Sequence, residues 1–184
     1  EIYVMGDGEY DPVAASELCA NLEQTIEDFD VVIVADYGHG MLAPEVVELL
    51  CSRARFLAVN TQTNAGNLGF NTISKYRRAD FICLSEGEIR LDARSRRRDL
   101  RGIIKETAAK LSCKQVIITQ GHNGCLAYSH EVGFSNIPAL AARVVDRVGA
   151  GDTLFSVAAL CAAQGAPAEI TGMIGNVGGA EAVA

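Results

Sequence analysis

Short apolar runs alternate with amphipathic stretches along the first two thirds of the chain. Four runs of four or five residues are rich in branched side chains, which is typical of strands covered on both faces of a sheet. These runs are VVIVA at 31–35, FLAVN at 56–60, FICL at 81–84 and VIIT at 116–119. Helical patterns lie around them, at 14–26, 44–54 and 100–111. Strand, helix and strand in this order predict right-handed crossovers and a mainly parallel sheet.

The pattern changes after the fourth run. The turn GHNG separates it from CLAYS at 125–129, and a second turn leads to FSNIP at 134–138, which predicts an antiparallel hairpin near one edge of the sheet. From residue 145 onward the chain reads as helical, with an apolar helix that stops at Gly165 and a second helix after Pro167. The sequence contains no internal repeat and no low-complexity linker. We therefore predict one α/β domain over residues 1–184, a mainly parallel sheet with helices on both faces.

Composition excludes several classes of protein. The chain has 184 residues, of which 49% are hydrophobic and 21% charged, as in ordinary globular domains. Its net charge of -7 argues against a nucleic-acid partner, and we interpret the arginine-rich stretch 94–101 as a solvated helix start. No apolar run reaches the roughly 18 residues of a membrane span, and no signal pattern precedes the first helix, so no membrane partner is expected.

The cysteines and histidines do not form a recognisable metal site. None of the six cysteines is part of a Cys-x-x-Cys motif, and most lie in apolar runs, which favours buried free thiols in a reducing, cytoplasmic environment. The three histidines lie in separate loop segments and do not have the spacing of zinc ligands.

Polar segments follow each predicted strand. They are ADYGHG at 35–40, NTQTNAGN at 60–67, SEGE at 85–88 and QGHNG at 120–124, and GAGD at 149–152 opens the late helix. Ligands of open α/β sheets collect at the carboxyl ends of the strands, so these segments are expected to line one crevice. Neither a Walker A loop nor a Gly-x-Gly-x-x-Gly turn after an early strand occurs, which argues against a P-loop NTPase and a typical NAD-dependent dehydrogenase.

The GAGD turn has a chemical interpretation of its own. Gly149, Ala150 and Gly151 stand at a helix N-terminus, where the first backbone N–H groups lack partners and the helix dipole is positive, so an anion can approach. Asp152 in the same turn is a candidate proton acceptor. The alternative is a tight connection with Asp in the favourable first turn.

Several motifs, in chain order, resemble those of one family. VVDRVGAGDTLF resembles the signature of the ribokinase-like sugar kinases, the PfkB carbohydrate kinase family, whose pattern is Asp-Thr-x-Gly-Ala-Gly-Asp followed by an aromatic residue. SEGE, TQGHNG and GNVGGAEAV support the resemblance, which runs from about Val31 onward, and ADYGHGML resembles the heptose-phosphate kinase branch. The resemblance implies a ribokinase-like core and an enzyme that transfers a phosphoryl group from ATP to a hydroxyl of a sugar or sugar phosphate, with Mg²⁺.

The resemblance also implies roles for the GAGD turn. Asp152 would be the general base that takes a proton from the sugar hydroxyl, and the N–H groups of Gly149, Ala150 and Gly151 would stabilise charge on the transferring phosphoryl group. Asp146 would lie near the phosphates and Mg²⁺, or it would anchor the turn.

The nucleotide would lie against two further segments. Thr119, Gly121 and Gly124 belong to the turn that the family places beside ATP, although the same turn is explained by a hairpin connection. Asn176 occupies a helix that the family packs beside the adenine, and its alternative is a plain polar helix residue.

Four further residues carry the expected metal and substrate contacts or depart from the family. The family has Asn-x-x-Glu where this chain has Ser85 and Glu88, so Glu88 is assigned either to the Mg²⁺ network or to a capping box with Ser85. Arg147 stands where the family usually has Thr. Asp36 directly follows an apolar strand and is expected to point into the crevice toward the substrate.

The start of the chain affects the functional prediction. It begins at Glu1 without Met, and the N-terminal segment that in the family supplies a Gly-Gly sugar-binding sequence and a small β lid is expected to be missing. The fragment alone is therefore expected to turn over slowly or not at all. The implied partners are ATP and a sugar or sugar phosphate, a homodimer is left open, and the alternative function is a non-catalytic nucleotide- or metabolite-binding module.

Overall fold

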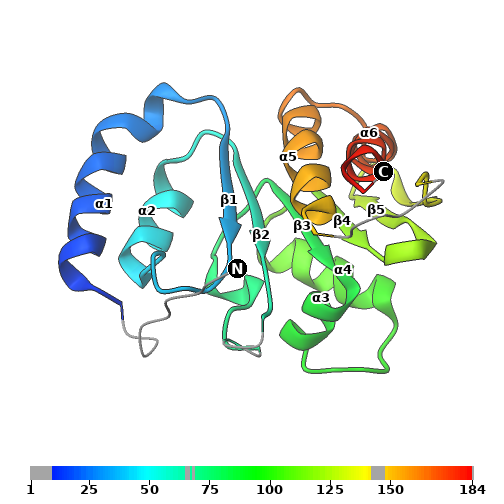
Figure 1. The fold of residues 1–184 in the computed structure, drawn as a ribbon, viewed down its shortest axis with the longest axis horizontal. Coiled ribbons are helices and arrows are strands. Elements are labelled where there is room, and N and C mark those ends of the chain that lie inside the picture. Colours follow the sequence, from blue (N-terminus) through cyan, green and yellow to red (C-terminus); the bar gives the residue numbers. More distant parts are fainter. Residues whose placement is uncertain (1–9, 65–66, 68, 142–147, 184) are drawn as a thin grey trace.

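The computed structural model describes residues 10–64, 67, 69–141 and 148–183 (Figure 1). Its helices are α1 (Pro12–Thr25), α2 (Pro44–Arg53), α3 (Glu86–Asp92), α4 (Leu100–Lys110), α5 (Ala150–Ala163) and α6 (Ala168–Ala182). Its strands are β1 (Val32–Asp36), β2 (Leu57–Thr61), β3 (Phe81–Ser85), β4 (Gln115–Thr119), β5 (Cys125–Ser129) and β6 (Gly133–Ile137). Short 3₁₀ turns lie at Ile26–Asp28, Ile73–Lys75 and Gly121–Asn123.

The strands form one sheet in which spatial order follows chain order from β1 to β6. Strands β1 to β4 are parallel, and β5 and β6 are added antiparallel at one edge, with Thr119 opposite Cys125 and Cys125 opposite Ile137. The predicted α/β class, with a mainly parallel sheet and a terminal hairpin, is confirmed. The parallel strands end at the same edge, where the loops after them meet.

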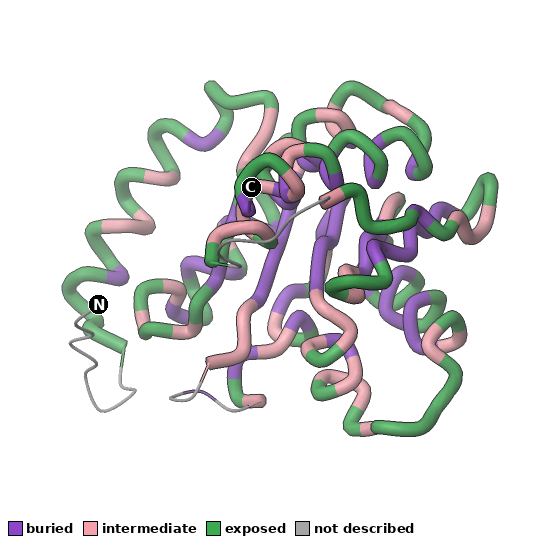
Figure 2. Tube along the Cα trace, turned by 45° about the vertical axis from the view of Figure 1, so that its right-hand side comes forward, coloured by how far each residue is buried: buried purple, intermediate pink, exposed green. Residues whose placement is uncertain are grey.

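The central strands give alternate side chains to two separate cores. Helices α1 to α4 pack on one face, and their core takes Leu57, Val59, Ile82, Leu84, Val116 and Ile118 from the sheet. Helices α5 and α6 pack on the other face, over Ala58, Phe81, Cys83, Ile117, Cys125 and Ala127. Figure 2 shows the buried residues gathered along the middle of the molecule. Helices on both faces of the sheet are thereby confirmed.

The second core brings the start of α5 to the sheet. Phe155 of α5 is 1% exposed and stacks on Phe81 of β3 with ring centroids 6.2 Å apart. Burial of a side chain of this size contributes about 1.5–3 kcal/mol. Helix α6 lies against α5 through glycines (Figure 1), because a Cβ at Gly175 would stand 3.0 Å from the Cβ of Ala158. This close packing fixes where α5 begins.

Strand β1 differs from the expectation for its apolar run. Val34 is buried, but Ile33 is 39% exposed and Ala35 is exposed, so the strand is covered on one face only. The reason is its place at the edge of the sheet, where the described residues of α5 and α6 leave its second face open. The prediction that this run is covered on both faces was wrong.

Two predictions can be compared with the described residues: that the chain has no membrane span and that its cysteines are free thiols. Among them, every helix is too short or too polar to cross a membrane. All six cysteines are described and are free thiols, four of them buried. Burial raises the pKa of the Cys125 thiol to about 11, so this group is a packed apolar side chain rather than a reactive one.

Candidate active site

The N-terminus of α5 is open on the side of its first turn. Gly149 adopts the left-handed conformation with φ of 82°, and none of the described side chains caps the helix. Among the described residues, no heavy atom lies within 4 Å of the position that a Cβ would take at Gly149 or Gly151. The described residues therefore leave room for an anion beside the backbone of this turn, where a helix N-terminus has N–H groups without intrahelical partners.

Asp152 lies in the same turn, and side chains from two strand ends hold its carboxylate. Its Oδ1 accepts a hydrogen bond from Nε2 of Gln62 at 2.6 Å, just after β2. Its Oδ2 accepts one from the hydroxyl of Tyr37 at 3.0 Å, just after β1. The structure thus brings the GAGD turn together with two of the polar segments that follow the strands. Gln62 was not singled out from the sequence, because no local pattern distinguishes it from other loop residues.

Three asparagine side chains fix the backbone of these two loops. Asn67 donates to the carbonyls of Tyr37 and Gln62, at 2.9 and 3.1 Å. Asn64 donates to the carbonyl of Tyr37 at 2.9 Å, and Asn71 donates to that of Gln62 at 3.3 Å. The residues that contact Asp152 are therefore anchored through their main chain.

Asp36 does not lie where the sequence placed it. Its side chain is 2% exposed and points to the same face of the sheet as Val34, away from the face covered by α5. It accepts hydrogen bonds from Tyr76 at 2.7 Å and from the N–H of Gly38 at 3.0 Å, and it pairs with Lys75 at 2.5 Å. Burial, and then the Asp36 carboxylate, raise the pKa of Tyr76. The expectation that Asp36 points into the crevice was wrong, and its contact with substrate stays a prediction that this geometry does not favour.

Glu88 forms the capping box that was one of its two interpretations. Oγ of Ser85 accepts the N–H of Glu88 at 3.2 Å, and Oε2 of Glu88 accepts the N–H of Ser85 at 2.7 Å. Oε1 of Glu88 also accepts the N–H of Thr63 at 3.2 Å. Glu88 thus joins α3 to the loop after β2, and both oxygens retain further lone pairs for other ligands.

Asn60 contributes an amide oxygen to the same region. Its Nδ2 donates to the carbonyl of Cys83 at 2.7 Å, while its Oδ1 is buried and has no hydrogen-bond partner among the described residues. Burial raises the pKa of the Cys83 thiol, with smaller contributions from Cys125, Glu88 and Asp152. Among the described residues, no group of three His, Cys, Asp or Glu side chains is arranged to hold a metal ion.

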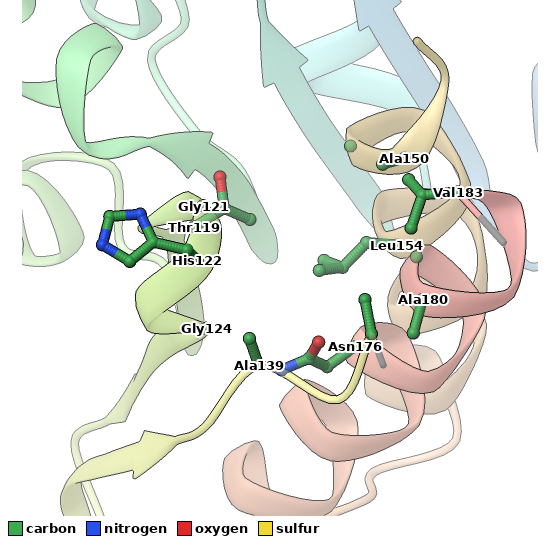
Figure 3. Close-up of a pocket in the computed structure, with 13 residues that line it drawn as sticks. Thr119, Gly121, His122, Gly124, Ala139, Ala150, Leu154, Asn176, Ala180 and Val183 are labelled. Carbon is green, nitrogen blue, oxygen red and sulfur yellow. The ribbon is translucent and has the colours of Figure 1, made fainter. Parts of the chain in front are cut away.

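A cavity of about 410 Å³ opens beside the start of α5. Figure 3 shows two walls, one made by Thr119, Gly121, His122 and Gly124 and the other by residues of α5 and α6. The lining includes these residues together with Ala139, Ala141, Ala150, Gly151, Leu154, Asn176, Gly179, Ala180 and Val183. All four residues predicted to contact the nucleotide line this cavity, as do two of the three residues predicted to form the anion hole.

The two glycines of the β4–β5 turn have different reasons for their identity. Gly124 has φ of 85°, and a Cβ there would stand 2.0 Å from the carbonyl oxygen of Ile137. Gly121 has φ of 58°, with nothing within 4 Å of a Cβ. Close packing, rather than approach of a ligand, explains Gly124.

Asn176 donates from Nδ2 to the carbonyl of Pro138 at 2.8 Å, so it joins α6 to the segment after β6.

Glu86 ties the β4–β5 turn to helix α3. Its carboxylate accepts hydrogen bonds from Nε2 of Gln120 and Nε of Arg90, both at 2.8 Å. The bond from Gln120, and then that from Arg90, lower the pKa of Glu86. The SEGE motif contains Glu86, but only Ser85 and Glu88 of that motif were interpreted from the sequence. Asp146 and Arg147 lie outside the described residues, so the metal role of Asp146 stays a prediction.

Comparison with known proteins gives matches over nearly the whole chain. The sequence model of the family described as pfkB family carbohydrate kinase matches residues 4–184. The bifunctional protein HldE of Citrifermentans bemidjiense is 30% identical over 159 residues, which cover 85% of this chain and 32% of that protein. HldE of Campylobacter jejuni subsp. doylei is 29% identical over 178 residues, which cover 88% of this chain and 37% of that protein. The chain spans about a third of the length of these curated relatives.

Solved structures share the fold. A mutant of phosphofructokinase-2 from Escherichia coli has a TM-score of 0.80 at 14% identity, covering 99% of this chain and 59% of that chain. Ribokinase from Thermotoga maritima has a TM-score of 0.68 at 17% identity, covering 87% of this chain and 52% of that chain. These likenesses confirm the ribokinase-like architecture that the sequence motifs implied.

Proposed function

The chain belongs to the pfkB family of carbohydrate kinases, and from this premise we propose that it transfers a phosphoryl group from ATP to a hydroxyl of a sugar or sugar phosphate. The observation that carries the proposal is the position of Asp152 in the open first turn of α5, next to the cavity lined by Ala150 and Gly151. Base, anion hole and nucleotide pocket are thereby contiguous. A second cavity, between Phe56 and Pro167, is lined by no residue of the GAGD turn.

Base, anion hole and pocket each have one task in the proposed chemistry. Asp152 accepts the proton of the acceptor hydroxyl as its oxygen attacks the terminal phosphorus of ATP, and the bond from that phosphorus to the bridging oxygen breaks. The N–H groups of Gly149, Ala150 and Gly151 donate hydrogen bonds to the charge that develops on the transferring group. The nucleotide occupies the cavity between the β4–β5 turn and helix α6.

Mg²⁺ fits the oxygen donors of this region. Glu88 has lone pairs left on both oxygens, and its Oε1 contacts Thr63 just after β2. Asn60 of β2 has a buried amide oxygen without a partner among the described residues. Carboxylate and amide oxygens and water are the ligands that Mg²⁺ takes, and Asn60 supplies the amide oxygen that Ser85 lacks. When bound with ATP, Mg²⁺ would neutralise charge on the phosphates.

Two finer assignments belong to the proposal. The motif ADYGHG and the similarity to HldE proteins support a heptose phosphate as the acceptor. The free cysteines and the use of ATP support a cytoplasmic location.

A second candidate function is a nucleotide- or metabolite-binding module without turnover. It is favoured by Ser85 in place of the family's Asn and by the two hydrogen bonds that occupy Asp152.

Calorimetry and turnover measurements on the Asp152→Ala variant distinguish the kinase from the binding module. We expect Mg·ATP to bind both the natural protein and Asp152→Ala with similar affinity, because Asp152 contacts the acceptor rather than the nucleotide. Turnover with a panel of sugar phosphates, measured on the longest natural polypeptide that contains this chain, is expected to fall by at least about 10²-fold in Asp152→Ala. Binding without turnover by either protein would support the module, and absence of binding by both would contradict the kinase.

A further inference from the structure

We infer that Gln62 and Tyr37 are positioning residues that hold the Asp152 carboxylate away from the N–H groups of its own helix and so keep those groups open for the phosphoryl group. The inference rests on the proposed function. It goes beyond that function because it assigns a task to two residues outside the GAGD turn.

The reason lies in the place of Asp152 along α5. Ala150 is the first helical residue, so Asp152 is the third, the position from which an acidic side chain reaches back to the uncapped N–H groups. Asp favours such local hydrogen bonds to the backbone. No other described side chain caps these N–H groups, so the site would be closed by its own base if the carboxylate were unrestrained.

The observed hydrogen bonds prevent this closure. Both carboxylate oxygens are engaged from the sheet side, Oδ1 by Gln62 at 2.6 Å and Oδ2 by Tyr37 at 3.0 Å. Both donors are neutral. They orient the carboxylate without placing a cation next to it, and each oxygen keeps a lone pair for the acceptor hydroxyl.

The two donors are themselves held in place. The N–H of Gln62 bonds to the carbonyl of Asp36 at 2.8 Å, and its own carbonyl accepts from Asn67 and Asn71. The carbonyl of Tyr37 accepts from Asn67 at 2.9 Å. Loops after two neighbouring strands are thus locked to one another, and the result is a fixed direction for the carboxylate.

Variants that remove one donor each test the inference. Gln62→Met and Tyr37→Phe keep the approximate shape of the side chain and remove the polar group that donates to Asp152. We expect kcat to fall at least about tenfold in each, with a smaller change in the KM for Mg·ATP, because a misdirected base is lost from the reacting geometry. Neither substitution should lower kcat further in the Asp152→Ala background, since both act through Asp152.

A spectroscopic readout reports the same event without turnover. In ¹⁵N–¹H spectra, the amide signals of Ala150 and Gly151 should shift downfield in Gln62→Met and Tyr37→Phe, as the carboxylate turns toward them. The shift should be absent when either substitution is combined with Asp152→Ala. Matched controls are Gln115→Met and Tyr128→Phe, whose polar groups bond to Ala166 and His130 instead.

Each outcome decides between the proposals. Lost turnover in Asp152→Ala, together with unchanged kcat and amide signals in Gln62→Met and Tyr37→Phe, would overturn this inference and leave the proposed function standing. Normal turnover in Asp152→Ala would overturn both. If Gln62→Met fails to fold, Tyr37→Phe still decides, because Tyr37 is 39% exposed and the substitution removes only its hydroxyl.

Discussion

Gly124 and Gly121 stand in one turn, and replacing each by Ala should have unequal effects. At Gly124 the positive φ of 85° is combined with a Cβ contact of 2.0 Å to the backbone of Ile137, which no side-chain rotation relieves. We expect Gly124→Ala to lower the free energy of unfolding by about 3 kcal/mol, and Gly121→Ala by about 1 kcal/mol. Urea unfolding of both variants measures the difference, and equal losses would contradict it.

At the level of residues, the sequence was most informative where a proposed role belongs to the backbone itself. Gly149 and Gly151 could be placed at a helix N-terminus, because that position needs no partner from elsewhere to offer N–H groups. Gln62 and Glu86 could not be recognised, because their roles exist only through partners at Asp152 and Gln120. Asp36 was misplaced because an apolar strand with one open face does not reveal which way the next side chain points.

Helix α3 depends on the side chain at its N-cap. Ser85→Ala removes the acceptor for the N–H of Glu88 and should lower the free energy of unfolding by about 1 kcal/mol. Ser85→Asn should lose little stability, because Asn is an equally good N-cap, and it introduces the residue that the family has at this position. Thermal or urea unfolding distinguishes the two. A loss in Ser85→Asn as large as in Ser85→Ala would show that the cap is not the reason.

The link between α3 and the β4–β5 turn should be sensitive to acid. Hydrogen bonds from Gln120 and Arg90 lower the pKa of Glu86 below its ordinary value of 4.5. The folded state therefore binds this proton more weakly than the unfolded state, and the stabilisation present above pH 4.5 is lost as the pH falls through the lower folded pKa.

Glu86→Gln should accordingly be less stable than the natural protein at neutral pH, and the difference should shrink as the pH falls from 4.5 through the lower pKa of the folded state. The urea midpoint of each protein measured against pH tests this. Glu106→Gln is the control, because Glu106 pairs with Arg98 at an exposed position and should change little. A constant difference at every pH would contradict the prediction.

At the level of elements, every helix and strand that was predicted from the pattern of apolar residues is present in the structure. The reason is that a continuous apolar run marks a strand that faces both cores, and the helical period marks the one apolar face of a helix. The exception was the cover of β1. An edge strand and a central strand can have the same apolar run, and the difference depends on where distant helices pack.

For the whole molecule, nucleotide binding should stabilise two separate regions of the chain. The cavity lies between Thr119–Gly124 and helix α6, which are joined mainly through the sheet. When the Mg·ATP concentration is about one hundred times the dissociation constant, binding should raise the free energy of unfolding by about 2.7 kcal/mol. Hydrogen exchange should slow at 119–124 and 176–183 and stay unchanged in α2, whereas protection of α2 alone would place the nucleotide elsewhere.

The strand order has a consequence for synthesis on the ribosome. Because spatial order follows chain order, each strand can pair with the one before it as soon as it emerges. Helices α5 and α6 follow all six strands along the chain, and until they emerge, the face that carries Phe81 and Ile117 lacks their cover for a time on the order of seconds. The nascent sheet is then a substrate for chaperones, and Asp152 reaches Gln62 only after the six strands have emerged.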